Sequence, residues 1–368
     1  MDADQRALTA TIEKFAHDTY GARSSRTPED APADYSVSVW RRMSELGLTG
    51  LCVPEECGGL GFSVVEILLV SEILGRALSP EPFATAAIVA AKLLEASAAG
   101  PTRDSMLLAI SNGEVRLAPA FYESVADYDL QSVDARISDE GGRLYIHGVK
   151  ELVVDGAGAT HFIVTARSEA GEINAYVVPV DVEGVKVSPR LGLDGRWLAS
   201  AEFNGAAVEG DAPLFESGEA LANVEHALDF GNLSLCAEAL GLMDRMLHLT
   251  AMHLAVREQF GKPIGTFQAL QHRFADMVVA MEQSRSVTWM AAAALESGEL
   301  GAGASDLSAA KSAVCRYGRT VLEGAIQLHG GMGMTADFEL AGYVRRLLAI
   351  EKTWGDRVYH ELRFLEAS

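Results

Sequence analysis

The chain has 368 residues, of which 49% are hydrophobic, and carries a formal charge of -21 at pH 7. This charge argues against nucleic acid and anionic membranes as partners, because both would be repelled, and it leaves any anionic ligand dependent on a local cluster of cations. No apolar run approaches the roughly 20 residues that cross a bilayer, and the N-terminus has no basic stretch followed by an apolar one, so we expect a cytoplasmic protein.

The length of the chain exceeds what one compact core usually supports, which predicts two or three domains.

The sequence of the N-terminal region indicates helices. Apolar residues such as Val64, Ile67 and Val70 recur at three-residue spacing, as they do in amphipathic helices that pack on a common core. Pro54 and several glycines interrupt this pattern and predict a turn. We predict a helical N-terminal domain over residues 1–112.

The middle of the chain has a different pattern. Short runs rich in β-branched and aromatic residues occur at 144–147, 162–165 and 175–178, and a turn sequence of Asp, Glu and two glycines lies at 139–142. Such runs between turns are typical of strands. We predict a central β-barrel or sandwich over residues 113–212.

Helical periodicity returns after this region. Leu235, Ala239, Leu242 and Met246 form one apolar stripe. The pattern predicts a C-terminal bundle of four or more long helices over residues 213–368. The Ala/Gly-rich piece 298–305 is short enough for a loop between two of them. The fold class is therefore α+β, in the order helix, β, helix.

The cysteines and histidines do not form a ligand pattern. Cys52, Cys57, Cys236 and Cys315 include no Cys-x-x-Cys pair, and the nine histidines include no pair at convincing metal-ligand spacing. We expect neither a disulfide framework nor a metal site.

Two segments of the C-terminal region combine a cation, an aromatic ring and amides with a glycine-rich backbone. In the first, the guanidinium of Arg257 matches phosphate oxygens and stays charged at any relevant pH. Phe260, three residues on, is expected on nearly the same helical face, where its ring packs against the ligand. Gln268 follows in the same segment and offers an amide donor and acceptor.

The second segment runs from Gln327 through Gly330 and Gly331. Gln327 adds another amide, and the two glycines allow the backbone to approach a phosphate or a ribose closely because no Cβ intervenes. Together the two segments predict a dinucleotide-binding surface.

Both segments resemble the acyl-CoA dehydrogenase family, whose members show Arg-x-x-Phe-Gly...Phe-Gln and Gln-x-x-Gly-Gly-x-Gly elements in a helical C-terminal domain. The likeness runs over nearly the whole chain and is strongest at residues 240–335. It implies the family's fold, FAD as cofactor, and an acyl-CoA thioester as substrate, from which a carboxylate removes the α-proton while the flavin accepts a hydride. It also implies the FAD-contacting residues, which in the family commonly reach a neighbouring subunit's FAD: Arg257, Gln259, Phe260, Gln268, Gln327, Gly330 and Gly331.

The central region departs from the family. In the family, a loop in this region usually has the sequence Thr-Glu-Pro-x-x-Gly-Ser-Asp, and residues 118–127 match it only weakly. The Gly-x-Lys-x-Trp-x-Thr element keeps Gly148 and Lys150, but Leu152 has no indole and Val154 has no hydroxyl to offer the flavin.

Neither position at which the family places its catalytic glutamate holds a carboxylate. Trp354 stands at the C-terminal position, and Gly231 stands at the position in the first long helix. Glu351 and Asp356 flank Trp354 and are the candidates for a displaced base. The competing interpretation makes them solvated or ion-paired carboxylates near Arg345 and Arg346. Three acidic residues of the first long helix are expected to be capping or interhelical groups: Asp229, Glu238 and Asp244.

The retained elements serve a neighbour's flavin, and the lost elements hold a subunit's own flavin ring and deprotonate its own substrate. The resemblance includes bacterial α2β2 heterotetramers, several acting on CoA thioesters of steroids, in which one subunit type brings the base. The leading hypothesis is a dehydrogenase subunit of fatty acid or steroid catabolism that lacks the base, shares FAD with a second acyl-CoA dehydrogenase subunit, and passes electrons to an electron-transfer flavoprotein. Two alternatives stay open: a homotetrameric dehydrogenase with a displaced base, and a non-catalytic acyl-CoA-binding or assembly subunit.

Overall fold

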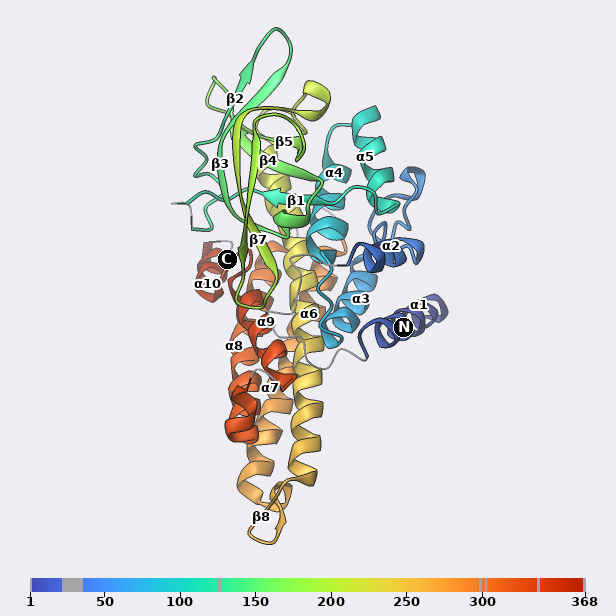
Figure 1. The fold of residues 1–368 in the computed structure, drawn as a ribbon, viewed down its shortest axis with the longest axis vertical. Helices are drawn as coiled ribbons and strands as arrows, with labels where there is room; N and C mark the ends of the chain where they lie inside the picture. The colour runs from blue at the N-terminus through green and yellow to red at the C-terminus, as the bar shows by residue number, and fades with distance from the viewer. Residues whose placement is uncertain are drawn as a thin grey trace.

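The chain folds into two helical regions and a sheet (Figure 1). This computed structural model describes residues 2–21, 36–124, 127–297, 300–301, 303–335 and 338–366. The N-terminal helices flank the upper half of a long helical bundle, the sheet lies at the top, and a small hairpin forms the lower tip of the bundle. The order helix, β, helix expected from the sequence is confirmed.

The N-terminal region is helical, as predicted. Its elements are α1 (Ala3–Tyr20), α2 (Val37–Glu45), η1 (Glu55–Cys57), α3 (Val64–Arg76), the π-helix η2 (Phe83–Val89), α4 (Ala90–Ala96) and α5 (Pro101–Ser111). A capping box formed by Ser63 and Glu66 begins α3. The predicted turn before α3 includes Gly58 and Gly61, whose φ values of 83° and 60° suit glycine.

The central region is one curled seven-stranded sheet. Its strands are β1 (Leu117–Ala120), β2 (Arg136–Asp139), β3 (Leu144–Val154), β4 (His161–Arg167), β5 (Ile173–Pro179), β6 (Val185–Leu191) and β7 (Trp197–Ala207). The spatial order is β1-β4-β2-β3-β7-β6, and β5 pairs with β4. β1 and β2 run parallel to β4, and the other pairs are antiparallel. The predicted turn at 139–142 connects β2 to β3.

Strand β4 is buried on both faces of the sheet. Phe162 and Val164 belong to the core enclosed by the curled sheet, whereas Ile163 belongs to the core shared with the helices. Successive side chains of a strand point to opposite faces, so a strand covered on both sides is apolar throughout. This explains the continuous apolar run in the sequence of β4.

The C-terminal region contains five α-helices among the described residues: α6 (Ala220–Val256), α7 (Gln268–Leu295), α8 (Ala304–His329), α9 (Leu340–Lys352) and α10 (Arg357–Glu366). Only α6, α7 and α8 are long, so the expectation of four or more long helices is wrong. Of the piece 298–305, which we expected to be a loop, residues 298, 299 and 302 lie outside the described part of the chain, and Ala304 already begins α8.

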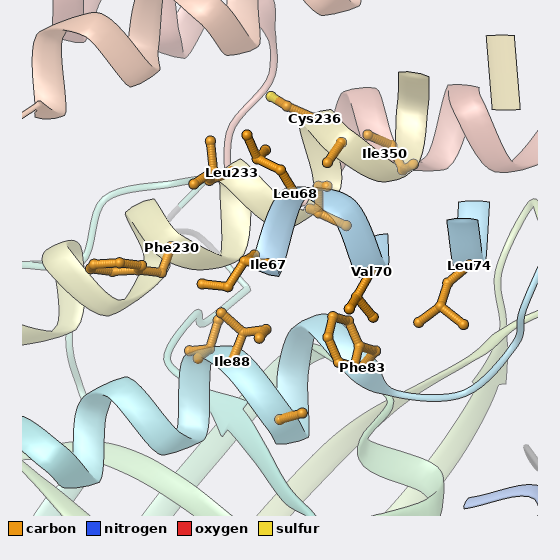
Figure 2. Packing of buried hydrophobic residues seen from close by; sticks show 14 of the residues in the cluster. Ile67, Leu68, Val70, Leu74, Phe83, Ile88, Phe230, Leu233, Cys236 and Ile350 are labelled. Carbon is orange, nitrogen blue, oxygen red and sulfur yellow. The ribbon is translucent and has the colours of Figure 1, made fainter. Parts of the chain in front are cut away.

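Glycines allow α3 to cross α6 at close range. A Cβ on Gly75 would lie 2.2 Å from the carbonyl oxygen of Glu238, and one on Gly241 would lie 2.0 Å from that of Glu72. Apolar side chains of α3, η2, α6 and α9 fill the space around this crossing (Figure 2). The N-terminal helices and the bundle therefore share one core, which fixes the walls of the cleft described below.

Two further findings concern the described residues as a set. None of their helices combines the length and apolarity needed to cross a bilayer. None of their histidine, cysteine and acidic side chains gather in a group that could hold a metal ion.

Candidate functional site

A cleft lies where the N-terminal helices, the sheet and the bundle meet. Its walls come from α3, the loop leading into η2, η2 itself, the end of β3, the loop between β6 and β7, α6, α9 and the segment after α9. The gap between its walls is about 440 Å³ when space open to solvent is counted, and the centre of a water-sized sphere can occupy about 20 Å³ of it. Apolar surface makes up most of the exposed lining, and five charged side chains also line the cleft: Glu81, Asp155, Arg196, Glu238 and Arg346.

Trp354 closes one side of this cleft by packing on Gly231. A Cβ on Gly231 would lie 2.6 Å from Cζ3 of Trp354 and 2.4 Å from Cγ2 of Val89. Trp354 is only 5% exposed and has a φ of 53°, which a bulky residue rarely adopts. Nδ2 of Asn232 donates a hydrogen bond of 3.3 Å to its carbonyl oxygen. The structure thus brings together the two positions singled out in the sequence as lacking a base.

A buried lysine supports the segment that carries Trp354. Nζ of Lys311, on α8, donates hydrogen bonds to the carbonyl oxygens of Ile350 at 2.9 Å and Thr353 at 3.2 Å. These carbonyls belong to the C-terminal end of α9, where a cation is favourable. Burial lowers the pKa of Lys311. The sequence analysis did not single out Lys311.

The two candidate displaced bases do not line the cleft. Glu351 accepts hydrogen bonds from Nε and Nη2 of Arg319 at 2.8 and 3.2 Å and lines a separate cavity of about 220 Å³. Asp356 pairs with Nζ of Lys352 at 2.8 Å and accepts from the first backbone N–H groups of α10. Both carboxylates are ion-paired, as one interpretation of the sequence expected. Their partners are Arg319 and Lys352, so the expectation of Arg345 and Arg346 is wrong.

A buried ionic network forms another part of the cleft wall. Arg346 donates from Nε and Nη2 to the two carboxylate oxygens of Glu238, each at 2.7 Å, and from Nη1 to Asp194 at 2.9 Å. Nη2 of Arg196 also donates to Glu238, at 2.9 Å. Burial alone would raise the pKa of Glu238, but Arg346 and Arg196 hold it below its usual value.

The three acidic residues of α6 that were singled out in the sequence are interhelical, as expected. Glu238 joins α6 to α9 through Arg346. Asp229 pairs with Arg363 of α10, at 2.9 Å for the contact between Oδ2 and Nη2. Asp244 pairs with Arg76 of α3 at 2.7 Å. The sequence indicated this role but not the partners.

The first predicted FAD segment lies at the lower tip of the bundle (Figure 1). Arg257 ends α6 with an extended backbone, and the chain continues into a hairpin of β8 (Glu258–Gln259) and β9 (Lys262–Pro263). Phe260 sits in the hairpin turn, with a φ of 56° and 93% exposure. The expectation that Arg257 and Phe260 share a helical face is wrong, because the helix ends at Arg257.

The second predicted segment ends α8 near the hairpin. Gln327 is exposed in the last turn, and Gly330 and Gly331 are exposed in the short helix η6 (Gly330–Met334). A Cβ on either glycine would meet nothing within 4 Å. The ring of His329 lies 4.5 Å from the ring of His253 on α6, one turn before Arg257. The stacked histidines therefore join the two segments.

The tip presents groups suited to a dinucleotide. Gln259 and Gln268 are exposed, like Arg257, and Arg257 forms no ion pair within the described part of the chain. Residues 253–275 contain Arg257, Lys262 and Arg273 against one acidic residue, Glu258, so their formal charge is +2 in a strongly acidic chain. This is the local cluster of cations that an anionic ligand requires.

The family-like lysine of the sheet has a structural role. Nζ of Lys150 is buried and donates to Glu123 at 2.6 Å and to Thr165 at 3.1 Å. The carboxylate of Glu123 also accepts from two backbone N–H groups and so anchors the loop that faintly echoes the family. Val125 and Ala126 of that loop lie outside the described residues. Leu152 is 60% exposed with a φ of 52°, while Val154 lines the cleft.

Comparison with known proteins extends these findings. The family profile described as "Acyl-CoA dehydrogenase, N-terminal domain" matches residues 2–111, and that described as "Acyl-CoA dehydrogenase, C-terminal domain" matches residues 220–357. A probable acyl-CoA dehydrogenase, fadE25 of Mycobacterium leprae, is 28% identical over 94% of this chain and 90% of its own length.

Solved structures agree. A variant of the Tcur3481-Tcur3483 steroid ACAD is 26% identical with a TM-score of 0.86, covering 99% of this chain and 97% of its own. A glutaryl-coenzyme A dehydrogenase complex with glutaryl-CoA shares the fold, with a TM-score of 0.92 at 22% identity over 99% of this chain and 95% of its own. Because profiles match both helical regions and relatives match nearly the full length, the chain belongs to the acyl-CoA dehydrogenase family.

Proposed function

We propose that this chain is the subunit without a base in a heteromeric acyl-CoA dehydrogenase and that it shares FAD with a second family subunit. The observation that carries the proposal is the contact between Trp354 and Gly231. An indole and a glycine occupy both positions where a base is expected, and neither group can take a proton. The similarity to a protein named as a steroid ACAD, with two chain names, agrees with a heteromer and with a bulky CoA thioester as substrate.

Family members generally bind FAD, and the tip of this bundle fits contacts to an FAD held by another subunit. Arg257 would pair with a phosphate, Phe260 would pack against a ring of the cofactor, and Gln259, Gln268 and Gln327 would supply amides. Gly330 and Gly331 leave the backbone accessible. The bound flavin supplies hydride acceptance. An electron-transfer flavoprotein is the proposed electron acceptor.

The end of β3 does not fit a flavin ring belonging to this chain. Leu152 and Val154 offer no hydroxyl or indole N–H, and Trp354 occupies one side of the adjoining cleft. In the shared reaction this subunit therefore helps to bind and orient the FAD that the partner subunit holds. The partner subunit removes the proton from the substrate.

The test is to purify the chain alone and together with the product of a neighbouring dehydrogenase gene. We expect a colourless isolated chain and a yellow complex whose flavin is bleached by an acyl-CoA. A yellow homo-oligomer of the isolated chain that is bleached by an acyl-CoA would contradict the proposal. A preparation that stays colourless with every candidate partner would favour the non-catalytic alternative.

A matched pair of arginine variants tests the shared site. Arg257→Gln is expected to weaken FAD binding by the complex about tenfold to a hundredfold, because a charge-assisted phosphate contact is lost. Arg41→Gln changes another exposed arginine, on α2, and is the control. FAD content and dissociation constants measured by fluorescence would read out both. Equal FAD affinity for the two variants would remove Arg257 from the site.

The homotetrameric alternative requires a displaced base. Glu351→Gln and Asp356→Asn are expected to leave the rate of flavin reduction unchanged, because both carboxylates are ion-paired and neither lines the cleft. Stopped-flow measurement of flavin bleaching checks this. Loss of reduction with retained FAD in either variant would support the alternative.

A further inference from the structure

Three aromatic rings from separate segments meet at the ends of α6 and α8. The ring of His329, the last residue of α8, contacts that of His253 on α6, with ring centres 4.5 Å apart and an angle of 30° between the planes. It also contacts the ring of Phe338, which precedes α9, with ring centres 5.1 Å apart. His329 is 5% exposed, so these contacts are shielded from water.

The ring of His329 is held by a single hydrogen bond and by its ring contacts. Its Nδ1 lies 2.9 Å from the carbonyl oxygen of Ala325, and a carbonyl only accepts, so Nδ1 carries a proton. Its Nε2 is buried and has no hydrogen-bond partner among the described residues. The contact with His253 is therefore one of ring faces, and another flat ring at position 253 can replace it.

This ring contact joins the two segments that form the tip of the bundle. His253 precedes Arg257 by one helical turn, and the backbone N–H of Arg257 donates to its carbonyl oxygen at 2.9 Å. His329 directly precedes Gly330, whose φ of 62° and ψ of -142° turn the chain into η6. A Cβ on Gly333 would lie 3.0 Å from Cβ of His329, so η6 folds back onto the same histidine.

The side chain of Arg257 has little other support. The helix ends at this residue, its side chain is exposed, and it forms no ion pair within the ranges that the structure describes. Its carbonyl oxygen accepts from the backbone N–H of Ile264 at 2.8 Å, which closes the hairpin on itself. The position of the hairpin relative to α8 therefore depends on contacts such as the one between the two histidines.

We propose that His253 and His329 are positioning residues for the cofactor site at the tip. Their ring contact fixes the backbone of Arg257 relative to that of Gly330 and Gly331, so that one dinucleotide meets both segments at once. A site held in its binding geometry loses less conformational entropy when the ligand binds. The inference rests on the proposed function for the identity of the ligand, and it gives a role to two side chains that need not touch FAD.

The first test compares variants of His253 in the complex with the partner subunit. His253→Ala removes the ring and should weaken FAD binding about tenfold, whereas His253→Phe keeps a ring face and should bind FAD within about twofold of the unmodified complex. His248→Ala, at an exposed histidine of the same helix, is the control. Fluorescence titration gives the dissociation constants.

Equal losses in His253→Ala and His253→Phe would refute the role of the ring contact, and unchanged affinity in His253→Ala would overturn the proposal. If His253→Ala does not fold, His253→Leu removes the ring while keeping apolar bulk, and the same outcomes apply to it.

Amide hydrogen exchange of the isolated chain tests the ring contact without FAD. His253→Ala should speed exchange at least about threefold in residues 257–264 and also in 330–334, although the second segment contains no substitution. His248→Ala should change neither. Unchanged exchange in 330–334 would refute the connection between the segments. Failure of the proposed function is recognised separately, because Arg257→Gln would then leave FAD affinity unchanged while the exchange experiment still reports the ring contact.

Discussion

The indole of Trp354 lies against the Cα of Gly231, 123 positions earlier in the chain, so closely that a single methyl group at Gly231 would overlap it. Gly231 lies in the middle of α6, where glycine is otherwise unfavourable. The contact therefore explains this glycine through close packing.

Gly231→Ala should lower the free energy of unfolding by about 1–3 kcal/mol, because the added methyl group overlaps both Trp354 and Val89. In a Trp354→Ala background, Gly231→Ala should lower the free energy of unfolding by less, because the indole that the added methyl group overlaps has been removed. Urea unfolding of the four proteins of this cycle measures the coupling. Gly331→Ala, at a site where a Cβ meets nothing within 4 Å, should leave stability unchanged. Equal costs of Gly231→Ala in both backgrounds would contradict the packing explanation.

Glu238→Gln should be among the most destabilising single changes in the cleft. It removes the charge that compensates the buried guanidiniums of Arg346 and Arg196, and breaking such a pair costs about 3–5 kcal/mol. Chemical denaturation at neutral pH gives the value. The control is Glu202→Gln, which breaks the exposed pair with Lys186 and should cost less than about 1 kcal/mol. Similar losses for both variants would show that Glu238 does not neutralise the network.

Asp356 should contribute to stability by capping α10. Its Oδ1 accepts from the backbone N–H groups of Val358 at 3.0 Å and Tyr359 at 3.1 Å. Asp356→Ala should cost about 1 kcal/mol more than Asp356→Asn, because asparagine also caps helices. Both substitutions remove the ion pair with Lys352, so their difference isolates the cap. Thermal unfolding of the two variants makes the comparison, and identical melting temperatures would argue against it.

His360 should make the fold sensitive to acid. Burial lowers its pKa to about 3, and the nearby Lys311 and Arg363 contribute, against Asp356 and a backbone contact with Trp354. The unfolded chain binds this proton below about pH 6.5, while the native state does so only near pH 3. The contribution of neutral His360 to the free energy of unfolding is therefore fully present above about pH 6.5. It decreases as the pH is lowered, by about 2 kcal/mol between pH 6.5 and pH 5.

The check is urea unfolding of the unmodified chain and of His360→Gln at pH 7 and pH 5. The variant should lose about 2 kcal/mol less than the unmodified chain over this interval. His147→Gln, at an exposed histidine of β3, should behave like the unmodified chain. An unchanged acid-induced loss in His360→Gln would mean that other groups cause it.

Several features followed from the sequence because they depend on neighbours within a few residues. The period of three to four residues in α3 and the apolar run in β4 each report a local backbone conformation and the faces it buries. The motif around Arg257 predicted the family, and the two family profiles that match the helical regions agree with it. The same local reasoning failed at Phe260, because the end of α6 is decided by a hairpin that the periodicity does not reveal.

Only the tertiary structure decided which distant side chains meet. The sequence offered arginines near Glu351 but not Arg319, and it offered no sign that Glu81 would be buried with one oxygen unpaired. Such contacts join residues far apart in the chain, and they depend on how α3, α6 and α9 pack together. The sequence determined the family, the order of the helical and β regions, and the absence of a carboxylate at two positions. The packing of these regions determined that those positions touch, because close-packed interiors allow few arrangements and local periodicity does not specify which one is adopted.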